Sequence, residues 1–412
     1  MEDGMRYQIG AYANTTKTKS LQFILIALAF LATCIWGLAS GKVEAVVGGP
    51  TCNVPSNYST IQAAVDDMGC TTINVAAGTY VENVNITRSL TLRGAKAGVD
   101  VSGRTAAGAQ ESTISGTGAD TASVTINAGN VVVNGFSITN ANHGLGVIVK
   151  TAGDDAVIKN NIVDNVGNTT YPGPTVGVYL EFGPDDVRVT DNRISNVKAG
   201  TGSAQGILVG DSTSTNPSLG VVVDNNTITD ATSTSKGAYG IQFNNGAKST
   251  GYVTGKITNN TLKNLNGKWA HAVGLEGDTP NVVVRKNTIS NLTSVGIDKV
   301  AVWFEDNDFF FTVDVNRNSL DVGTSAAGIA VASSLVTKYP TLTVDGTCNW
   351  WGSKGGPGLV ASGTGSLVSP GVDFKPWLKS SKLKGDCGDK GDFNDHSFGH
   401  KNDDKDRWDW KD

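Results

Sequence analysis

A short phrase built around asparagine recurs along the chain and limits what the chain can fold into. Each copy has Asn, a second residue, Ile or Leu, another residue, and then Asn or Asp. The copies lie about 27 to 34 residues apart and begin at Asn160, Asn192, Asn226, Asn260 and Asn287, with a weaker copy at Asn318. A regular period of this length is typical of repeat proteins, in which each repeat packs on the next.

A short apolar run keeps step with the asparagine phrase, as in Gly146–Val149, Gly177–Leu180 and Gly206–Val209. A β-branched piece lies between the two, so each repeat contains about three short strands and no helix-length pattern. Strands that stack on their counterparts at about 4.8 Å form parallel sheets, and crossovers between parallel strands are right-handed. The sequence therefore predicts an all-β fold, a right-handed parallel β-helix (solenoid) of about ten coils.

The recurring asparagines have a structural explanation. Tight bends between strands need a residue that tolerates left-handed backbone angles, and Asn is the best choice after Gly. Equivalent Asn side chains in successive coils then lie above one another and can hydrogen-bond as a ladder. We therefore predict a structural role for these residues and no role in catalysis or metal binding.

The two ends of the chain differ from the repeats. Residues 1–45 contain the apolar stretch Leu21–Ala39 and small residues after it, which predicts a signal peptide or, alternatively, a membrane anchor. An amphipathic helix within Val54–Asp67 is expected to cover the first coil of a β-helix that spans 46–379. Residues 380–412 are rich in Asp, Gly and Lys and are predicted to be a disordered tail.

Four cysteines flank the predicted β-helix, two near its beginning and two near its end: Cys52, Cys70, Cys348 and Cys387. The simplest disulfide pairing joins neighbours, Cys52 to Cys70 and Cys348 to Cys387, although the sequence permits three connectivities. Such bonds would fix the exposed first and last coils, and they agree with a secreted or cell-surface protein.

The beginning and the end of this region resemble a known family. The pieces IQAAV, INVAAGTYVENVNI, LTLRGA and STISG resemble the N-terminal part of pectin methylesterases and related pectin lyase-like, right-handed parallel β-helix proteins. CNWWGSKGGPG (Cys348–Gly358) and FKPWL (Phe374–Leu378) resemble the closing segment of secreted bacterial proteins of this repeat class. The resemblance implies a carbohydrate-binding or sugar-hydrolysing class of protein.

The catalytic motifs of pectin methylesterases are nevertheless missing. We find no Gln-Asp-Thr-Leu motif, no Asp-Phe-Ile-Phe-Gly motif and no Leu-Gly-Arg-Pro-Trp motif. Methylesterase activity is therefore not expected, and a fold of this kind does not by itself define an activity.

A column of equivalent positions offers a candidate site instead. Glu276 and Glu305 each follow an apolar run in adjacent repeats, so their backbones should lie about 5 Å apart. With Asp278 and Asp306 they form an oxygen-rich set that can hold Ca²⁺. Lys150, which follows an earlier apolar run, and also Lys268 and Lys299 are candidate bases for an elimination reaction. Alternatively, two carboxylates at this spacing can act on a glycosidic bond, or all these acids are solvated loop residues.

Aromatic residues suggest a second group of contacts. Tyr179 and Trp303 occupy the same position in their strands. If this face points outward, both rings can stack on sugars, and if it points inward, both belong to the core.

Together these features predict a secreted or surface β-helix protein that binds, and in one interpretation cleaves, an extracellular acidic polysaccharide containing uronate. The enzyme would be a polysaccharide lyase or a glycoside hydrolase, with calcium as the one cofactor considered. The alternative is a non-catalytic structural protein or adhesin. The net charge of −5 and the absence of a basic stripe argue against nucleic-acid binding, and a monomer is expected.

Overall fold

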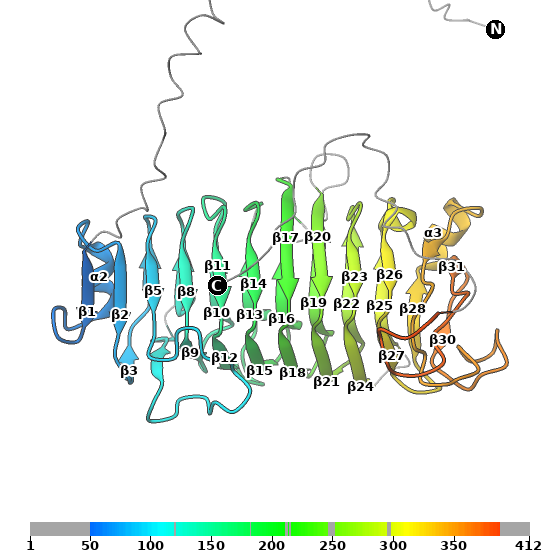
Figure 1. The fold of residues 1–412 in the computed structure, drawn as a ribbon, viewed down its shortest axis with the longest axis horizontal. Coiled ribbons are helices and arrows are strands. Elements are labelled where there is room, and N and C mark those ends of the chain that lie inside the picture. Colours follow the sequence, from blue (N-terminus) through cyan, green and yellow to red (C-terminus); the bar gives the residue numbers. More distant parts are fainter. Residues whose placement is uncertain are drawn as a thin grey trace, which may run out of the picture. The chain divides into compact units, whose positions relative to one another are not determined.

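The computed structural model describes residues 50–387, except 119–120, 182, 211–212, 214–215, 246–251 and 295–297. The described chain winds through three parallel β-sheets of 12, 10 and 9 strands. Strands from successive coils lie side by side along the molecule (Figure 1). Neighbours in a sheet are about three strands apart in chain order, because each coil adds one strand to each sheet. The prediction of an all-β, right-handed parallel β-helix of about ten coils is confirmed.

The 12-stranded sheet consists of β1 (Thr51–Val54), β2 (Thr72–Val75), β5 (Thr91–Arg93), β8 (Val132–Asn134), β11 (Val157–Lys159), β14 (Arg188–Thr190), β17 (Ser218–Asp224), β20 (Val253–Thr258), β23 (Val283–Arg285), β26 (Asp314–Asn316), β29 (Val344–Asp345) and β31 (Val372–Asp373). The 10-stranded sheet consists of β4 (Val84–Ile86), β7 (Val124–Ile126), β10 (Leu145–Val149), β13 (Thr175–Leu180), β16 (Ala204–Val209), β19 (Ala238–Asn245), β22 (Ala270–Gly277), β25 (Lys299–Glu305), β28 (Ala327–Val331) and β30 (Leu367–Val368). The 9-stranded sheet consists of β3 (Gly78–Val81), β6 (Ser112–Ser115), β9 (Phe136–Asn140), β12 (Ile162–Val166), β15 (Arg193–Ala199), β18 (Thr227–Ser233), β21 (Thr261–Gly267), β24 (Thr288–Ser294) and β27 (Ser319–Asp321).

The core fills the space that the three sheets enclose. Alternate residues of each strand point inward, and the inward positions are almost all Val, Ile, Leu or Phe. In the 10-stranded sheet, for example, Ile241, Phe243 and Leu275 are fully buried. Equivalent inward positions in successive coils pair in register, so like side chains stack along the axis.

A ladder of buried asparagine side chains runs through seven coils, as predicted. The Nδ2 group of Asn192 donates to Oδ1 of Asn226 at 3.0 Å, and the backbone N–H of Asn192 donates to the same oxygen at 3.0 Å. Nδ2 of Asn226 in turn donates to Oδ1 of Asn260 at 3.1 Å and to the carbonyl of Val189 at 2.7 Å. The ladder consists of Asn161, Asn192, Asn226, Asn260, Asn287, Asn318 and Asn349.

Two details of the asparagine prediction are wrong. In the first coil that contributes to the ladder, the ladder residue is Asn161 and not Asn160. Val163 pairs in register with Ile194 of the next coil, so Asn161 occupies the position that corresponds to Asn192. The ladder residues also do not adopt the left-handed backbone. That conformation belongs to the residue just before each of them, such as Asn225 with φ of 52°, and to the residue four positions after most of them, such as Asp230 with φ of 60°.

A helix and a disulfide close the N-terminal end of the β-helix. Helix α2 (Ile61–Asp66) lies within the range predicted, and the Thr60 side chain caps it by accepting the N–H of Ala63 at 3.1 Å. The Cys52–Cys70 disulfide joins β1 to the segment between this helix and β2. The first coil is therefore fixed both covalently and by packing.

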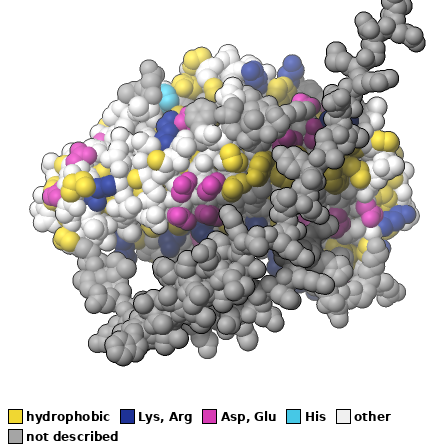
Figure 2. Space-filling model, turned by 90° about the horizontal axis from the view of Figure 1, so that it is seen from above, with side chains coloured by type: hydrophobic (Ala, Val, Ile, Leu, Met, Phe, Trp, Pro, Cys, Tyr) yellow, Lys and Arg dark blue, Asp and Glu magenta, His cyan; other side chains and the backbone are white. Residues whose placement is uncertain are grey.

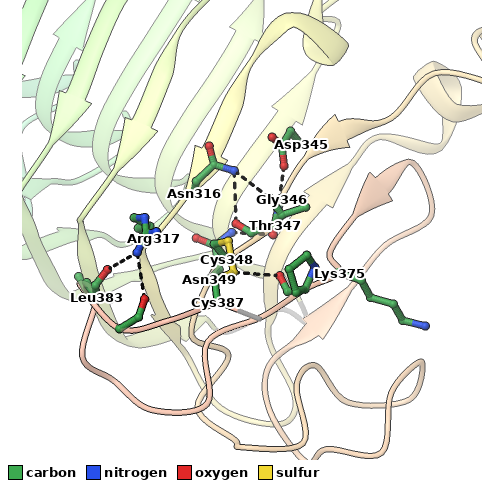
Figure 3. Close-up of a disulfide and its surroundings, with 12 residues drawn as sticks. Asn316, Arg317, Asp345, Gly346, Thr347, Cys348, Asn349, Lys375, Leu383 and Cys387 are labelled. Atoms are coloured by element: carbon green, nitrogen blue, oxygen red, sulfur yellow. Dashed lines mark hydrogen bonds between the residues drawn. A yellow bond between two sulfur atoms is a disulfide. The ribbon is translucent and has the colours of Figure 1, made fainter. Parts of the chain in front are cut away.

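The C-terminal end is closed by the second predicted disulfide, Cys348–Cys387 (Figure 3). Arg317 holds the same segment through hydrogen bonds to the carbonyls of Leu383 at 3.3 Å and Gly385 at 3.1 Å. Two short helices, η1 (Phe310–Thr312) and α3 (Ser333–Lys338), lie near this end and were not anticipated. Residues 380–387 thus belong to the closing segment, and the rest of the predicted tail lies outside the described residues.

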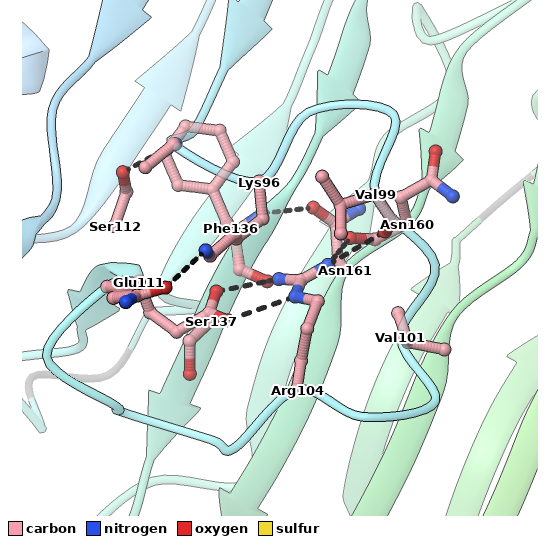
Figure 4. A network of polar contacts seen from close by, with 12 residues as sticks. Lys96, Val99, Val101, Arg104, Glu111, Ser112, Phe136, Ser137, Asn160 and Asn161 are labelled. Atoms are coloured by element: carbon pink, nitrogen blue, oxygen red, sulfur yellow. Dashed lines mark hydrogen bonds and ion pairs between the residues drawn. The ribbon is translucent and has the colours of Figure 1, made fainter.

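A long loop, residues 94–111, leaves the coil between β5 and β6 and is fastened to the neighbouring coils by one buried arginine. Arg104 forms a two-pronged ion pair with Glu111 at 2.7 and 3.0 Å, and it also donates to the carbonyls of Phe136 and Asn160 (Figure 4). Because every oxygen that it contacts belongs to this loop or the coils beneath it, we assign this network a structural role.

Residues 1–45, for which a signal peptide or anchor is predicted, lie outside the described residues. Within the part of the chain that the structure describes, no helix is long and apolar enough to cross a membrane.

Candidate functional site

The outer face of the 10-stranded sheet carries polar and aromatic side chains where three strands, β19, β22 and β25, lie next to one another. Three rows of outward positions cross these strands. They contain Tyr239 and His271 in the first row, which Gln205 of β16 precedes, Gln242, Gly274 and Trp303 in the second, and Asn244, Glu276 and Glu305 in the third. We call these residues, together with Trp269 and Asp298 beside them, the outer-face cluster.

Two carboxylates occupy adjacent positions in this cluster. Glu276 and Glu305 pair in register on β22 and β25, as the sequence predicted, so their backbones are about 4.8 Å apart. Oε2 of Glu276 accepts Nε2 of Gln242 at 2.6 Å and Nδ2 of Asn244 at 3.5 Å. Its other oxygen, Oε1, is buried and has no hydrogen-bond partner among the described residues.

The surroundings of Glu276 favour its protonated form. Burial raises the pKa of this carboxyl, and the charge of the neighbouring Glu305 raises it further. His271 and the hydrogen bond from Gln242 act in the opposite direction but do not reverse the shift. Glu305 differs from Glu276 because it is exposed, and one of its oxygens accepts Nε1 of Trp303 at 3.1 Å. Two carboxyls with different environments are the usual basis for acid and base roles.

Aromatic rings lie beside the carboxylates. The imidazole of His271 lies between the rings of Tyr239 and Trp303, with centroid distances of 5.4 and 5.3 Å. His271 is only 3% exposed, and its Nε2 is 3.3 Å from the Asp298 carboxylate, although no hydrogen bond of good geometry joins them. A ring row of this kind presents flat apolar surface next to acidic groups.

The position of Tyr239 depends on a small neighbour. Its hydroxyl accepts Nε1 of Trp269 at 2.8 Å. Burial, followed by the charge of Glu276, raises the pKa of this hydroxyl, so Tyr239 stays protonated. A Cβ on Gly274 would lie 3.2 Å from the Tyr239 ring and 3.3 Å from Oε1 of Glu276. The backbone of Gly274 does not have a left-handed φ. Glycine at this position is therefore explained by the limited space for a Cβ and not by the backbone conformation.

Two of the predicted site residues lie outside the cluster. Lys150 follows β10, four strands away from β22, and pairs with Glu181, so it cannot act as a base beside Glu276. Tyr179 points outward, as one of the two alternatives held, but it is 9% exposed and packs with Ile148 and Leu208 in a separate apolar group. Trp303, by contrast, lies in the cluster and is half-buried.

The four acids suggested as calcium ligands are not brought together as a set. Asp278 lies beyond the end of β22 and is buried, and Asp306 lies in the turn after β25 with φ of 51°. Across the described ranges, no group of three or more His, Cys, Asp or Glu side chains is placed to hold a metal ion. The calcium site therefore stays a prediction without a ligand set.

Several members of the cluster were not singled out from the sequence. Gln205, Tyr239 and His271 each stand directly before an apolar run, one position outside the columns that were compared. Gln242 occupies the strand position equivalent to Tyr179 and Trp303, but it was not considered as a site residue. Reading the residue before each run, as well as the residue after it, would have shown a polar and aromatic column.

Figure 2 shows one long face of the molecule, on which acidic side chains gather in small groups and basic side chains are scattered. A cavity of about 470 Å³ lies elsewhere, near the N-terminal end, and is lined by Asn53, Asn74 and Arg93 among others. We place the candidate site at the outer-face cluster, because the cavity contains no pair of acidic or nucleophilic groups.

Comparison with known proteins agrees with the fold. The family model described as a right-handed beta helix region matches residues 68–250 and 177–366. No curated protein and no solved structure matches the chain. The closer resemblance to pectin methylesterases and pectin lyase-like proteins therefore remains a prediction. Because the two matches together span residues 68–366, well over half of the chain, the protein belongs to the right-handed β-helix family.

Proposed function

We propose that this protein binds a polysaccharide across the outer face of the 10-stranded sheet and hydrolyses a glycosidic bond at Glu276 and Glu305. One observation carries the proposal: a half-buried carboxyl with a raised pKa and one unpartnered oxygen lies in register beside an exposed carboxylate. Aromatic rings of the kind that stack on sugars flank the pair. The β-helix fold is consistent with polysaccharide binding or a surface role.

The two carboxyls have different roles in the proposed reaction. Glu276, whose raised pKa favours its protonated form, donates its proton to the glycosidic oxygen as the bond to that oxygen breaks. Glu305 attacks the anomeric carbon and forms a glycosyl–enzyme bond, which water then hydrolyses while Glu276 takes up a proton from that water. Retaining glycosidases hold their carboxyls about 5 to 5.5 Å apart, which agrees with in-register residues on adjacent parallel strands.

Elimination receives less support as the reaction. A lyase needs a base near the sugar ring. Of the predicted bases, Lys150 pairs with Glu181 far from the cluster, and Lys299 on β25 donates to Oγ of Ser325 on the following coil. The two disulfides favour an extracellular setting, so we propose that the protein acts outside the cell or on its surface.

The experiment measures new reducing ends released by the full chain from a panel of acidic and neutral polysaccharides. Ultraviolet absorbance of unsaturated products, recorded in parallel, detects elimination. We expect reducing ends without unsaturated product, and we expect Glu276→Gln to lower the rate at least about 100-fold, because a lost general acid has effects of this size.

Glu181→Gln is the matched control. Glu181 stands at the equivalent position of β13, after the same apolar run, but it pairs with Lys150 and lies outside the cluster. Equal losses in the two variants would contradict the assignment. Binding without any product from any polymer would instead favour the alternative, a non-catalytic surface or adhesin β-helix.

A further inference from the structure

In the outer-face cluster the glutamine amide donors form hydrogen bonds, whereas one glutamine amide acceptor does not. Nε2 of Gln205 donates to Oε1 of Gln242 at 2.8 Å, and Nε2 of Gln242 donates to Glu276 at 2.6 Å. The amide donors are thus directed along a chain that ends at Glu276. The acceptor that remains is Oε1 of Gln205, which is buried and has no partner among the described residues.

A buried acceptor without a partner costs free energy, so a ligand that supplies a donor is favoured there. Gln205 is 7% exposed, and its free oxygen lies on the outer face at the edge of the cluster. The carboxylates of Glu305 and Asp298 add further acceptors on the same face. Sugar hydroxyls are donors and match this set, whereas an ionised carboxylate offers acceptors alone.

The charge of the cluster points the same way. Glu305 and Asp298 are acidic, and the three strands β19, β22 and β25 contain a single Lys or Arg residue, Lys299. Nζ of Lys299 donates to Oγ of Ser325 at 3.1 Å on the following coil. Lys299 is thus engaged with Ser325, and the carboxylates of Glu305 and Asp298 repel an anionic sugar at short range.

From these observations we infer that the sugar bound over β19, β22 and β25 is uncharged and rich in hydroxyl groups, so the substrate is a neutral polysaccharide. Trp303, which is half-buried, supplies ring surface for the apolar face of the sugar, and the acceptors of Gln205 and Glu305 bind its hydroxyls. This inference rests on the binding half of the proposed function and not on cleavage. It differs from the acidic polysaccharide that the sequence predicted.

The test compares polymers that differ in charge and share a backbone. Polygalacturonate and alginate are each reduced so that every carboxylate becomes a hydroxymethyl group, and each reduced polymer is paired with its parent. Neutral xylan, mannan, galactan and β-glucan complete the panel. Binding is measured by affinity electrophoresis and calorimetry with the full-length Glu276→Gln variant, so that cleavage of the polymer does not interfere with the measurement.

We expect at least one neutral polymer to bind and every reduced polymer that binds to do so at least about tenfold more tightly than its acidic parent, which corresponds to about 1.4 kcal/mol. Equal or tighter binding of an acidic parent overturns the inference, and so does failure to bind any neutral polymer. Neutral binding by the unmodified protein without new reducing ends would refute the proposed hydrolysis and leave this inference intact.

Two variants locate the effect. Glu305→Lys, which reverses the charge inside the cluster, should reduce the preference for neutral over acidic polymer at least about fivefold. Asp321→Lys makes the same change on an exposed residue of the 9-stranded sheet and should leave the preference unchanged. An equal effect of both variants would mean that overall charge, and not the cluster, sets the selectivity, which would overturn the inference.

Discussion

Two rows of buried polar side chains run along this β-helix, and they differ in how completely their hydrogen bonds are made. In the asparagine ladder, Asn226 accepts two hydrogen bonds and donates three, so both ends of its amide are used. In the outer-face cluster, Gln205, His271 and Glu276 each retain a buried atom with no hydrogen-bond partner among the described residues. The ladder is complete without any ligand, whereas the cluster is not.

This difference separates stability from function. A satisfied buried network holds one structure in place, and removing a member leaves its neighbours without partners. An incomplete network costs free energy in the absence of a ligand and is explained if a ligand completes it. Mutations in the two rows should therefore have opposite consequences for folding and for binding.

The largest expected effect on stability is in the ladder. Asn226→Leu keeps the size of the side chain but removes five hydrogen bonds, and it leaves the buried N–H of Asn192 without its acceptor. A buried donor without a partner costs about 1 to 3 kcal/mol and each further lost hydrogen bond about 0.5 to 1.5 kcal/mol, so we expect the free energy of unfolding to fall by at least about 3 kcal/mol. Urea denaturation monitored by circular dichroism measures it.

Asn266→Leu serves as the control for that change. Asn266 lies in β21 but is exposed and outside the ladder, so its replacement should change the free energy of unfolding by less than about 0.5 kcal/mol. Similar losses in the two variants would show that the ladder has no special role.

A smaller effect is expected from the matching substitution in the outer-face cluster. Gln205→Met keeps the length of the side chain and removes an acceptor that has no partner, at the cost of one hydrogen bond to Gln242. Because these effects oppose each other, the free energy of unfolding should change by less than about 1 kcal/mol. Affinity for polysaccharide should fall in the same variant. A loss of stability as large as that of Asn226→Leu would assign the cluster to the fold and remove the contrast.

The smallest effect is a dependence of stability on pH. Burial and the charge of Glu305 raise the pKa of Glu276 above its ordinary value of 4.5. The folded protein therefore holds this proton more tightly than the unfolded chain. The resulting stabilisation is complete below the ordinary pKa and is lost as the pH rises through the pKa of the folded state.

The side chain introduced by Glu276→Gln does not titrate. The free energy of unfolding of this variant minus that of the unmodified protein should therefore increase between about pH 4 and about pH 8. Glu181→Gln, measured over the same range, gives the reference for an acid outside the cluster. A difference that stays constant or decreases with pH would show that Glu276 is not held in its protonated form.

Much of the fold could be read from the sequence, because its causes are local or periodic. The alternation of apolar residues set the strands, and the spacing of the phrases set the coils. Thr60 and the apolar stripe after it were enough to place α2. Helix α3 has the same length as α2 but was missed, because Ala332 at its N-cap position gives no capping signal.

The candidate site was predicted in part. Glu276 and Glu305 were placed side by side because they follow equivalent runs in adjacent repeats, and the structure pairs them. Lys150 was linked to them through its column alone, although three strands lie between β10 and β22. Whether Tyr179 and Trp303 face outward could not be decided, because a shift of one residue exchanges the two faces of a strand.

The sequence by itself determined the repeat, the three strands of each coil, the inward apolar positions and the places of the caps, since each of these follows from short-range pattern. The tertiary structure decided which asparagine enters the ladder in the first coil and which strand face is outward. It also brought Gln205, Tyr239 and His271 together from three different coils. The reason is that loop lengths vary between coils, so the alignment of positions across coils is fixed by stacking of the strands and not by distance along the chain.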